Sequence, residues 1–157
     1  MSNLELITNA FDRRDRKKLW IPQYLLEDNE LEITPVITWM HNKLPIGYMI
    51  YNDGDQMSGI SLHPTKPNKQ VRPCAGMCDF CMQVYSSSQI HMFTYQKTPT
   101  LSVSFYICSD LGCEKRIMDP DFPKLYSTRE TLSKPEKITR YHGRVQRFFL
   151  EHVQRSR

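Results

Sequence analysis

The segment CAGMCDFCMQV, residues 74–84, contains three of the five cysteines of this 157-residue chain, and the remaining two lie in YICSDLGCEKR, residues 106–116. Cys78 and Cys81 form a C-x2-C pair, a spacer of 26 residues follows, and Cys108 and Cys113 form a C-x4-C pair. Two cysteine pairs separated by a short folded insert are typical of a structural zinc site. The spacing therefore predicts one structural Zn²⁺ held by Cys78, Cys81, Cys108 and Cys113.

Other interpretations of these cysteines fit the pattern less well. A dithiol redox motif normally lies near a βαβ pattern, whereas this C-x2-C follows a proline-rich segment at residues 63–73. A catalytic zinc site uses three protein ligands, often histidines, and keeps one position open for water. Cys74, with C-x3-C spacing, is better read as a small buried or unpaired thiol than as a ligand. His91 is the other conceivable ligand, but we expect it to pack or form hydrogen bonds within a strand.

The pattern around the cysteines predicts antiparallel strands. IGYMIY (46–51) and MSGISL (57–62) flank the turn sequence NDGD and predict one hairpin, and residues 89–95 and 101–108 predict a second. In the last strand the apolar residues alternate with polar ones and share one face: Leu101, Val103, Phe105 and Ile107. Residues 46–118 are therefore expected to form a β and zinc-finger body.

Helices are expected at both ends of this body. Ser2 and Glu5 form a capping-box pattern that opens a predicted helix over residues 1–18. A second amphipathic helix is predicted over residues 135–154, with one apolar side that comprises Ile138, Tyr141, Val145, Phe148 and Phe149. The predicted fold class is α+β, with residues 1–157 as a single domain.

The spacing of the second cysteine pair also suggests how the finger is built. Cys108 is expected to end a strand and Cys113 to lie in the first turn of a helix, with Asp110 as its N-cap. Free N–H groups and the helix dipole there would stabilise the thiolate of Cys113. A knuckle, a hairpin and a helix that contributes a ligand make a treble-clef arrangement. Arg72, Lys115 and Arg116 are near enough in sequence to offset the negative charge of a zinc tetrathiolate.

Composition narrows the class of protein. The net charge is +4, which is too small to argue for nucleic acid by itself. No secretory signal or apolar run of membrane-spanning length is visible, so we expect a cytoplasmic monomer with no membrane partner. No phosphate-binding loop, nucleophile elbow or paired carboxylates are found, which argues against an enzyme.

The same residues resemble a known family. The segments TWM (38–40), YMIY (48–51), CDFC (78–81), IHMF (90–93) and YICSDLGC (106–113), together with the C-terminal helix, are similar to the zinc-binding C-terminal domain of the FusB-type elongation factor G-binding proteins. The likeness covers about residues 20–155. It implies a treble-clef finger on an α+β body, binding to elongation factor G and release of that factor from the ribosome, as in fusidic acid resistance. We expect the separate N-terminal helical bundle of the larger members to be absent or reduced to one helix, and the sequence resembles the short, single-domain members of the family.

Two binding functions are therefore considered. The first is contact with elongation factor G or the ribosome through residues near the zinc site: Phe80, Tyr106, Lys115 and Arg116. Phe80 is either a core residue beside the metal or an exposed anchor. The second is nucleic-acid (RNA) binding by a zinc-finger protein. A basic stripe on the C-terminal helix could contact either ribosomal RNA phosphates or an acidic patch of a protein partner: Arg140, Arg144 and Arg147. A solvated helix face is the alternative for that stripe.

Overall fold

The structure is a computed structural model that describes residues 1–65, 75–123 and 130–154. Five strands form one antiparallel sheet and two form a small separate sheet. The strands, in chain order, are β1 (Val36–Met40), β2 (Gly47–Asn52), β3 (Met57–Pro64), β4 (Ala75–Met77), β5 (Val84–Ser86), β6 (Ile90–Thr98) and β7 (Leu101–Cys108). The larger sheet has the order β1-β2-β3-β6-β7, and β4 pairs with β5. The predicted α+β class with an antiparallel sheet is confirmed.

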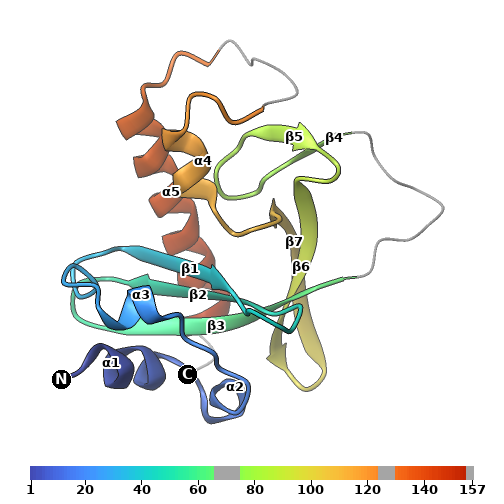
Figure 1. The fold of residues 1–157 in the computed structure, drawn as a ribbon. Coiled ribbons are helices and arrows are strands. Elements are labelled where there is room, and N and C mark those ends of the chain that lie inside the picture. The colour runs from blue at the N-terminus through green and yellow to red at the C-terminus, as the bar shows by residue number, and fades with distance from the viewer. Residues whose placement is uncertain (66–74, 124–129, 155–157) are drawn as a thin grey trace.

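Helices lie on both sides of this sheet (Figure 1). They are α1 (Asn3–Ala10), α2 (Arg13–Arg16), α3 (Gln23–Leu26), α4 (Cys113–Met118), α5 (Lys134–Phe148) and the π-helical turn η1 (Phe149–Val153). Figure 1 shows α5 crossing the β1–β3 region, with α1 and α2 below that region. Within the described ranges, every helix is too short or too polar to cross a membrane.

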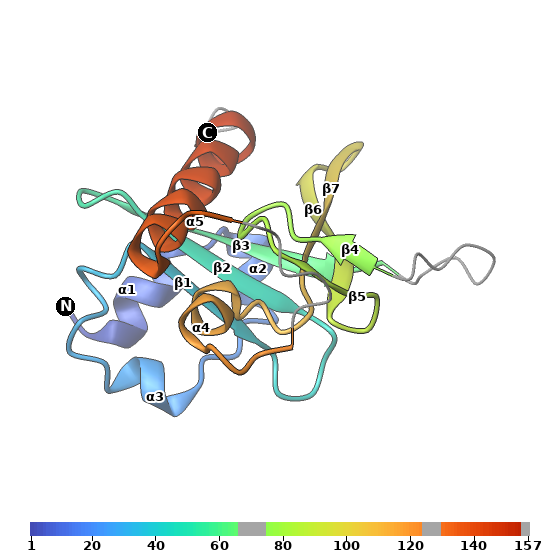
Figure 2. The same ribbon diagram turned by 90° about the horizontal axis from the view of Figure 1, so that it is seen from above.

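The sheet separates two hydrophobic cores. Successive side chains of a strand point to opposite faces. Ile37 and Trp39 of β1 accordingly pack with Phe11 and the other N-terminal residues, whereas Val36 packs in the second core with Phe149 and the four cysteines. The view from above in Figure 2 shows α1 on one side of the strands and α5 on the other. The metal centre therefore belongs to one of two cores that share a sheet.

The β6–β7 hairpin leaves the plane of the first three strands. β3 pairs with β6 only at His63–Thr94 and Pro64–Phe93, so the two parts of the sheet are joined over a short length. Figure 1 shows the hairpin at a steep angle to β1–β3, and one end of it approaches α4 and the β4–β5 sheet. The hairpin spacer predicted between the cysteine pairs is thus present, and it carries Cys108 to the metal centre.

The burial along β7 follows the predicted alternation toward the cysteines. Phe105 and Ile107 are buried, whereas Ser104 and Tyr106 are exposed. Leu101, predicted on the buried face, has 51% of its surface exposed because it lies where β6 turns into β7.

The N-terminal helix is present but shorter than the predicted range of residues 1–18. The capping box between Ser2 and Glu5 forms, and α1 then ends at Ala10. Phe11 adopts an extended backbone, and its ring lies 6.0 Å from that of Trp39 and 5.9 Å from that of Tyr48. Burial of this ring accompanies the break, and the basic residues that follow lie on and after the separate short helix α2.

The C-terminal helix begins at Lys134, close to the predicted residue 135. Ser133 is its N-cap: the Ser133 hydroxyl accepts from the Glu136 amide, and the Glu136 carboxylate accepts from the Ser133 amide at 2.7 Å. The last turn widens into η1, which continues the element to Val153. The apolar side predicted for it faces the core, with Tyr141, Val145, Phe148 and Phe149 buried and Ile138 partly buried.

Gly59 allows the N-terminal layer to approach the sheet closely. A Cβ added at Gly59 would lie 2.8 Å from two carbons of the Phe11 ring, closer than any ordinary contact. Phe11 is itself 1% exposed and held between two aromatic rings, so it has little space into which to move.

We predict that Gly59→Ala destabilises the protein by about 1–3 kcal/mol, because overpacking forces a buried ring to shift. Gly143→Ala is the matched control: its Cβ would meet nothing within 4 Å, and it lies on the exposed side of α5. There alanine should stabilise the helix by about 0.5–1 kcal/mol. Urea unfolding of both variants measures the difference, and equal stabilities would refute this account of the Gly59 contact.

Candidate metal centre

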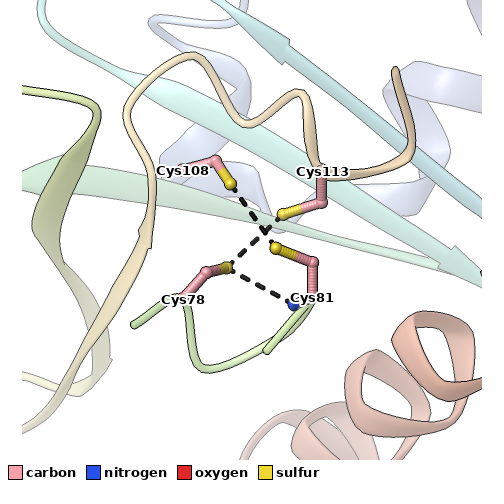
Figure 3. A group of neighbouring side chains, drawn as sticks. All are labelled: Cys78, Cys81, Cys108 and Cys113. Carbon is pink, nitrogen blue, oxygen red and sulfur yellow. Dashed lines mark hydrogen bonds between the residues drawn. The ribbon is translucent and has the colours of Figure 1, made fainter. Parts of the chain in front are cut away.

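Figure 3 shows the sulfurs of four buried cysteines clustered together, pointing toward one another. The Sγ atoms of Cys78 and Cys113 are 3.6 Å apart, those of Cys81 and Cys108 are 3.7 Å apart, and all four lie within 4.8 Å of one another. All four are free thiols, and the separations are far longer than a disulfide bond of about 2.05 Å. A tetrahedral zinc site with Zn–S bonds of about 2.3 Å places its sulfurs about 3.8 Å apart. The four cysteines therefore fit one structural Zn²⁺.

The first pair lies in the turn between β4 and β5. Met82 has a positive φ of 62°, so the backbone reverses within the turn. The Cys78 carbonyl accepts from the Met82 amide at 2.9 Å, and the Gln83 carbonyl accepts from the Cys78 amide at 3.0 Å. The Cys81 amide donates to Cys78 Sγ at 3.4 Å, a contact that favours the thiolate form. The small β4–β5 sheet is thus the frame that holds the zinc knuckle.

The second pair brackets a turn between β7 and α4. Cys108 is the last residue of β7 and Cys113 the first of α4, as predicted. Between them Leu111 has a φ of 57°, and its amide donates to the Cys108 carbonyl at 2.8 Å.

The expectation that Asp110 caps α4 is wrong. The N-cap position is Gly112, and it makes no side-chain cap hydrogen bond. Asp110 instead accepts from the Gly112 amide at 2.8 Å, two residues along, and forms an ion pair with Arg116. This aspartate therefore shapes the turn before the helix.

The second turn is fixed to the sheet as well as to the sulfurs. Thr38 of β1 donates its hydroxyl to the Leu111 carbonyl at 2.6 Å. The Leu111 side chain lies directly over Gly47 of β2, where an added Cβ would approach Leu111 Cδ1 to 2.5 Å. Leu111 is fully buried. The metal centre is therefore attached to the edge of the larger sheet by both a hydrogen bond and a close packing contact.

The electrostatics of the buried cluster call for a cation. Burial raises the pKa of the Cys113 thiol, and the neighbouring sulfurs of Cys108, Cys78 and Cys81 raise it further. Four thiolates cannot be held together in an apolar core unless a positive ion compensates them. Bound zinc would supply that charge, and the four cysteines would be its ligands in a closed site with no position left for substrate.

Arg116 is a buried structural residue and not a surface contact. Its side chain is 2% exposed, and its guanidinium donates to the Gln89 carbonyl at 2.9 Å and to the Ser109 hydroxyl at 3.2 Å. It also pairs with Asp110 at 3.1 Å. The guanidinium carbon lies 4.9 Å from the centre of the Tyr85 ring and 4.5 Å from that of Phe122. Arg116 thus joins the β5–β6 loop, the cysteine turn and the knuckle sheet, and its assignment to a partner-binding surface is corrected.

Phe80 is also buried, so it is a core residue beside the metal centre and not an exposed anchor for a partner. It is 3% exposed, and its ring lies 5.1 Å from Phe105 and 5.7 Å from Phe148. An aromatic side chain in this position fixes the knuckle against β7 and α5 and does not reach a partner.

The predicted basic stripe on α5 is largely engaged within the protein. Arg140 pairs with Glu130 and donates to the Cys81 carbonyl, and Arg144 donates to the Asp79 carbonyl. Two arginines therefore hold backbone carbonyls of the zinc knuckle. Arg147, with 78% of its side chain exposed, pairs with Glu151 one turn later. These three arginines therefore do not form a stripe of free cations that could contact nucleic-acid phosphates.

The remaining predicted residues fall in different places. Tyr106 is 42% exposed on β7, and Lys115 is exposed on α4. His91 is exposed on β6 and is outside the group of potential metal ligands found in the described part of the chain. Cys74 and Arg72 lie outside the described residues.

A comparison with known protein families agrees with this geometry. The family model described as the FBP C-terminal treble-clef zinc-finger matches residues 5–153. The match includes all four clustered cysteines and both layers that cover the sheet. A search of curated proteins found no match to the chain.

The purified protein is predicted to contain one zinc ion per chain, measured by elemental analysis. Cys108→Ser should abolish stoichiometric zinc and lower the melting temperature by about 10 °C or more, because structural zinc contributes folding free energy directly. Cys74→Ser is the control and should change both quantities little. A Cys108→Ser protein that melts with the parent would show that this cysteine is not a structural ligand.

Arg116→Lys is predicted to destabilise the protein by about 3 kcal/mol, because lysine keeps the charge but cannot replace the planar set of donors at a buried site. Lys115→Arg, at the neighbouring exposed position, should leave stability unchanged. Thermal unfolding of the zinc-loaded parent and of both variants measures their stabilities. If Arg116→Lys were as stable as the parent, the positive charge alone would be sufficient to stabilise this site.

Proposed function

The chain belongs to the FBP C-terminal treble-clef zinc-finger family, and from this membership we propose that it is a zinc-containing binding protein that associates with translation elongation factor G on the ribosome. The match over residues 5–153 is the observation that carries the proposal. We further propose that binding promotes release of the factor, the activity that underlies fusidic acid resistance in the FusB-type group. The place of action would be the cytoplasm, where elongation factor G works.

A closed zinc site supports a binding role for the protein. The four sulfurs are fully buried and fit a metal without an open position, so the ion would hold a surface in shape and not activate water. Fixing a binding surface in advance lowers the entropy that must be lost when a partner docks. The function would then lie with exposed residues around the knuckle.

The best-supported contact surface is the knuckle face, which we define by Asp79, Tyr106, Arg144 and Arg147. The Asp79 amide donates to the Tyr106 carbonyl at 2.8 Å, and its carboxylate accepts from the Tyr106 amide at 2.7 Å. The Asp79 carbonyl in turn accepts from Arg144, and Arg147 follows one turn along α5. These contacts hold Tyr106 and Arg144 beside Asp79, and exposed Arg147 lies three residues further along α5. Tyrosine and arginine are the side chains that most often dominate binding energy at interfaces.

Nucleic-acid binding is the weaker alternative. Arg140 and Arg144 are held by Glu130 and the knuckle carbonyls, which leaves fewer free cations for phosphates. Direct binding to ribosomal RNA would weaken steeply as salt increases, whereas a tyrosine-centred protein interface would depend on salt much less.

Zinc-loaded protein is predicted to bind purified elongation factor G, measured by isothermal titration calorimetry. Tyr106→Ala and Arg144→Gln should each weaken binding by about tenfold, as expected for interface hot spots. Arg13→Gln on α2 is the matched control, since it removes an exposed arginine from the N-terminal layer.

Absence of binding at micromolar concentrations would overturn the proposed partner. Binding that is unaffected by both knuckle-face variants would keep the partner but reject this surface. Tight binding to a ribosomal RNA fragment, with a steep salt dependence and no binding to the factor, would support the nucleic-acid alternative.

A further inference from the structure

Strand β1 is an edge strand of the larger sheet, and its outer side presents unpaired backbone groups. The Pro35 carbonyl accepts from the Asn52 amide, and the Ile46 carbonyl accepts from the His41 amide. Hydrogen-bonded pairs alternate along an antiparallel ladder, so Ile37 and Trp39 are the β1 residues that bond to β2. The amides and carbonyls of the three residues between and beside them point outward: Val36, Thr38 and Met40. No backbone partner for these groups lies within residues 1–65, 75–123 and 130–154.

This edge forms the floor of a groove of about 570 Å³. One wall comes from the segment that contains α3 and includes Trp20 and Tyr24, and the other comes from the cysteine turn and the start of α4. Figure 1 shows β1 between α4 above and α3 below. Tyr24 is 60% exposed although it lines the groove, so a large aromatic surface is available beside the free edge.

The groove carries more negative than positive charge. Asp28, Asp110 and Glu114 line it, and Lys115 is the single cation among the described residues that line it. Asp110 pairs with Arg116, and Glu114 lies 3.3 Å from His142, but their side chains remain 54% and 49% exposed. Glu27, Glu30 and Glu32 lie exposed on the segment that leads into β1. A zinc tetrathiolate behind the Leu111 turn would add two further negative charges.

We propose that this groove binds an extended peptide segment that carries basic and apolar side chains in alternation and pairs with β1 as an additional strand. Main-chain hydrogen bonds to Val36, Thr38 and Met40 supply affinity in this mode, and pockets for alternate side chains supply specificity. The apolar side chains would contact Tyr24 and Trp20, and the basic ones would face the carboxylates. The proposal does not depend on elongation factor G, because the knuckle face and this groove use different residues.

Thr38→Pro is the sharpest test of main-chain pairing. Proline removes the outward N–H of Thr38, which β2 does not use, and proline is tolerated on edge strands for this reason. It also removes the hydroxyl bond to the Leu111 carbonyl, so Thr38→Val is the matched control that loses the same hydroxyl but keeps the N–H. Circular dichroism and zinc content establish that both variants are folded.

The probe is an acetylated and amidated peptide of about seven residues in which lysine alternates with valine, long enough to span a strand. Titration into the ¹⁵N-labelled, zinc-loaded full chain should shift the amides of Val36, Thr38 and Met40 and slow their hydrogen exchange. Thr38→Pro should weaken binding by about tenfold, equivalent to one or two hydrogen bonds, and Thr38→Val should not. A peptide in which glutamate replaces lysine should bind at least about tenfold more weakly, because like charges oppose each other.

Several results would overturn the proposal. These are no binding at millimolar peptide, equal binding of the lysine and glutamate peptides, or binding that leaves the β1 amides unchanged. A Thr38-dependent dimer in sedimentation would assign the edge to a second copy of the chain instead. If Thr38→Pro does not fold, N-methylation of the alternate peptide residues whose N–H groups face β1 removes the reciprocal bonds, which the peptide amides would donate to the β1 carbonyls. Undiminished binding of that peptide would be equally decisive.

Discussion

The convergence of four cysteine sulfurs in an apolar core is the constraint on which the rest of this structure depends. Two of the sulfur pairs are 3.6 Å and 3.7 Å apart and all four sulfurs lie within 4.8 Å of one another, so they are free thiols that cannot ionise together without a cation. A zinc ion would convert that unfavourable cluster into a bound tetrathiolate, so that folding and metal binding become one process. The knuckle, the β6–β7 hairpin and α4 are short elements that could not bury much surface alone, and the metal would hold them in a fixed arrangement.

The centre is connected to its surroundings by a small number of buried contacts. Arg116 joins the segments that carry both cysteine pairs, and Thr38 and Leu111 tie the second turn to the sheet. Arg140 and Arg144 hold the knuckle from α5 by its backbone carbonyls. Charged side chains near the metal are therefore part of the framework, and the surface available for partners is smaller than a count of basic residues suggests.

Two different surfaces result from this framework. The knuckle face presents tyrosine and arginine side chains on segments next to the cysteine knuckle. The β1 edge lines a groove, between an aromatic wall and an acidic one, and its outward backbone groups have no strand partner among the described residues. Both have a cysteine turn as a border, so the same ion that stabilises the fold would also fix the shape of each surface. Loss of metal would be expected to affect both together.

The sequence by itself determined the chemistry and the framework of the centre. Paired cysteines at set spacings fix the ligand type, and the periodicity of apolar residues in β7 and α5 identifies the faces that must be buried, because both depend on residues close together in the chain. The tertiary structure alone decided which neighbours are exposed. Phe80 and Arg116 are near the ligands in sequence, yet both lie inside because segments distant in the chain cover them. The short strands β1, β4 and β5 contain too few alternating residues to be recognised from the sequence. Nor can the sequence show that β1 is an edge strand, because that depends on which strands pair with it in the folded sheet and not on its own residues.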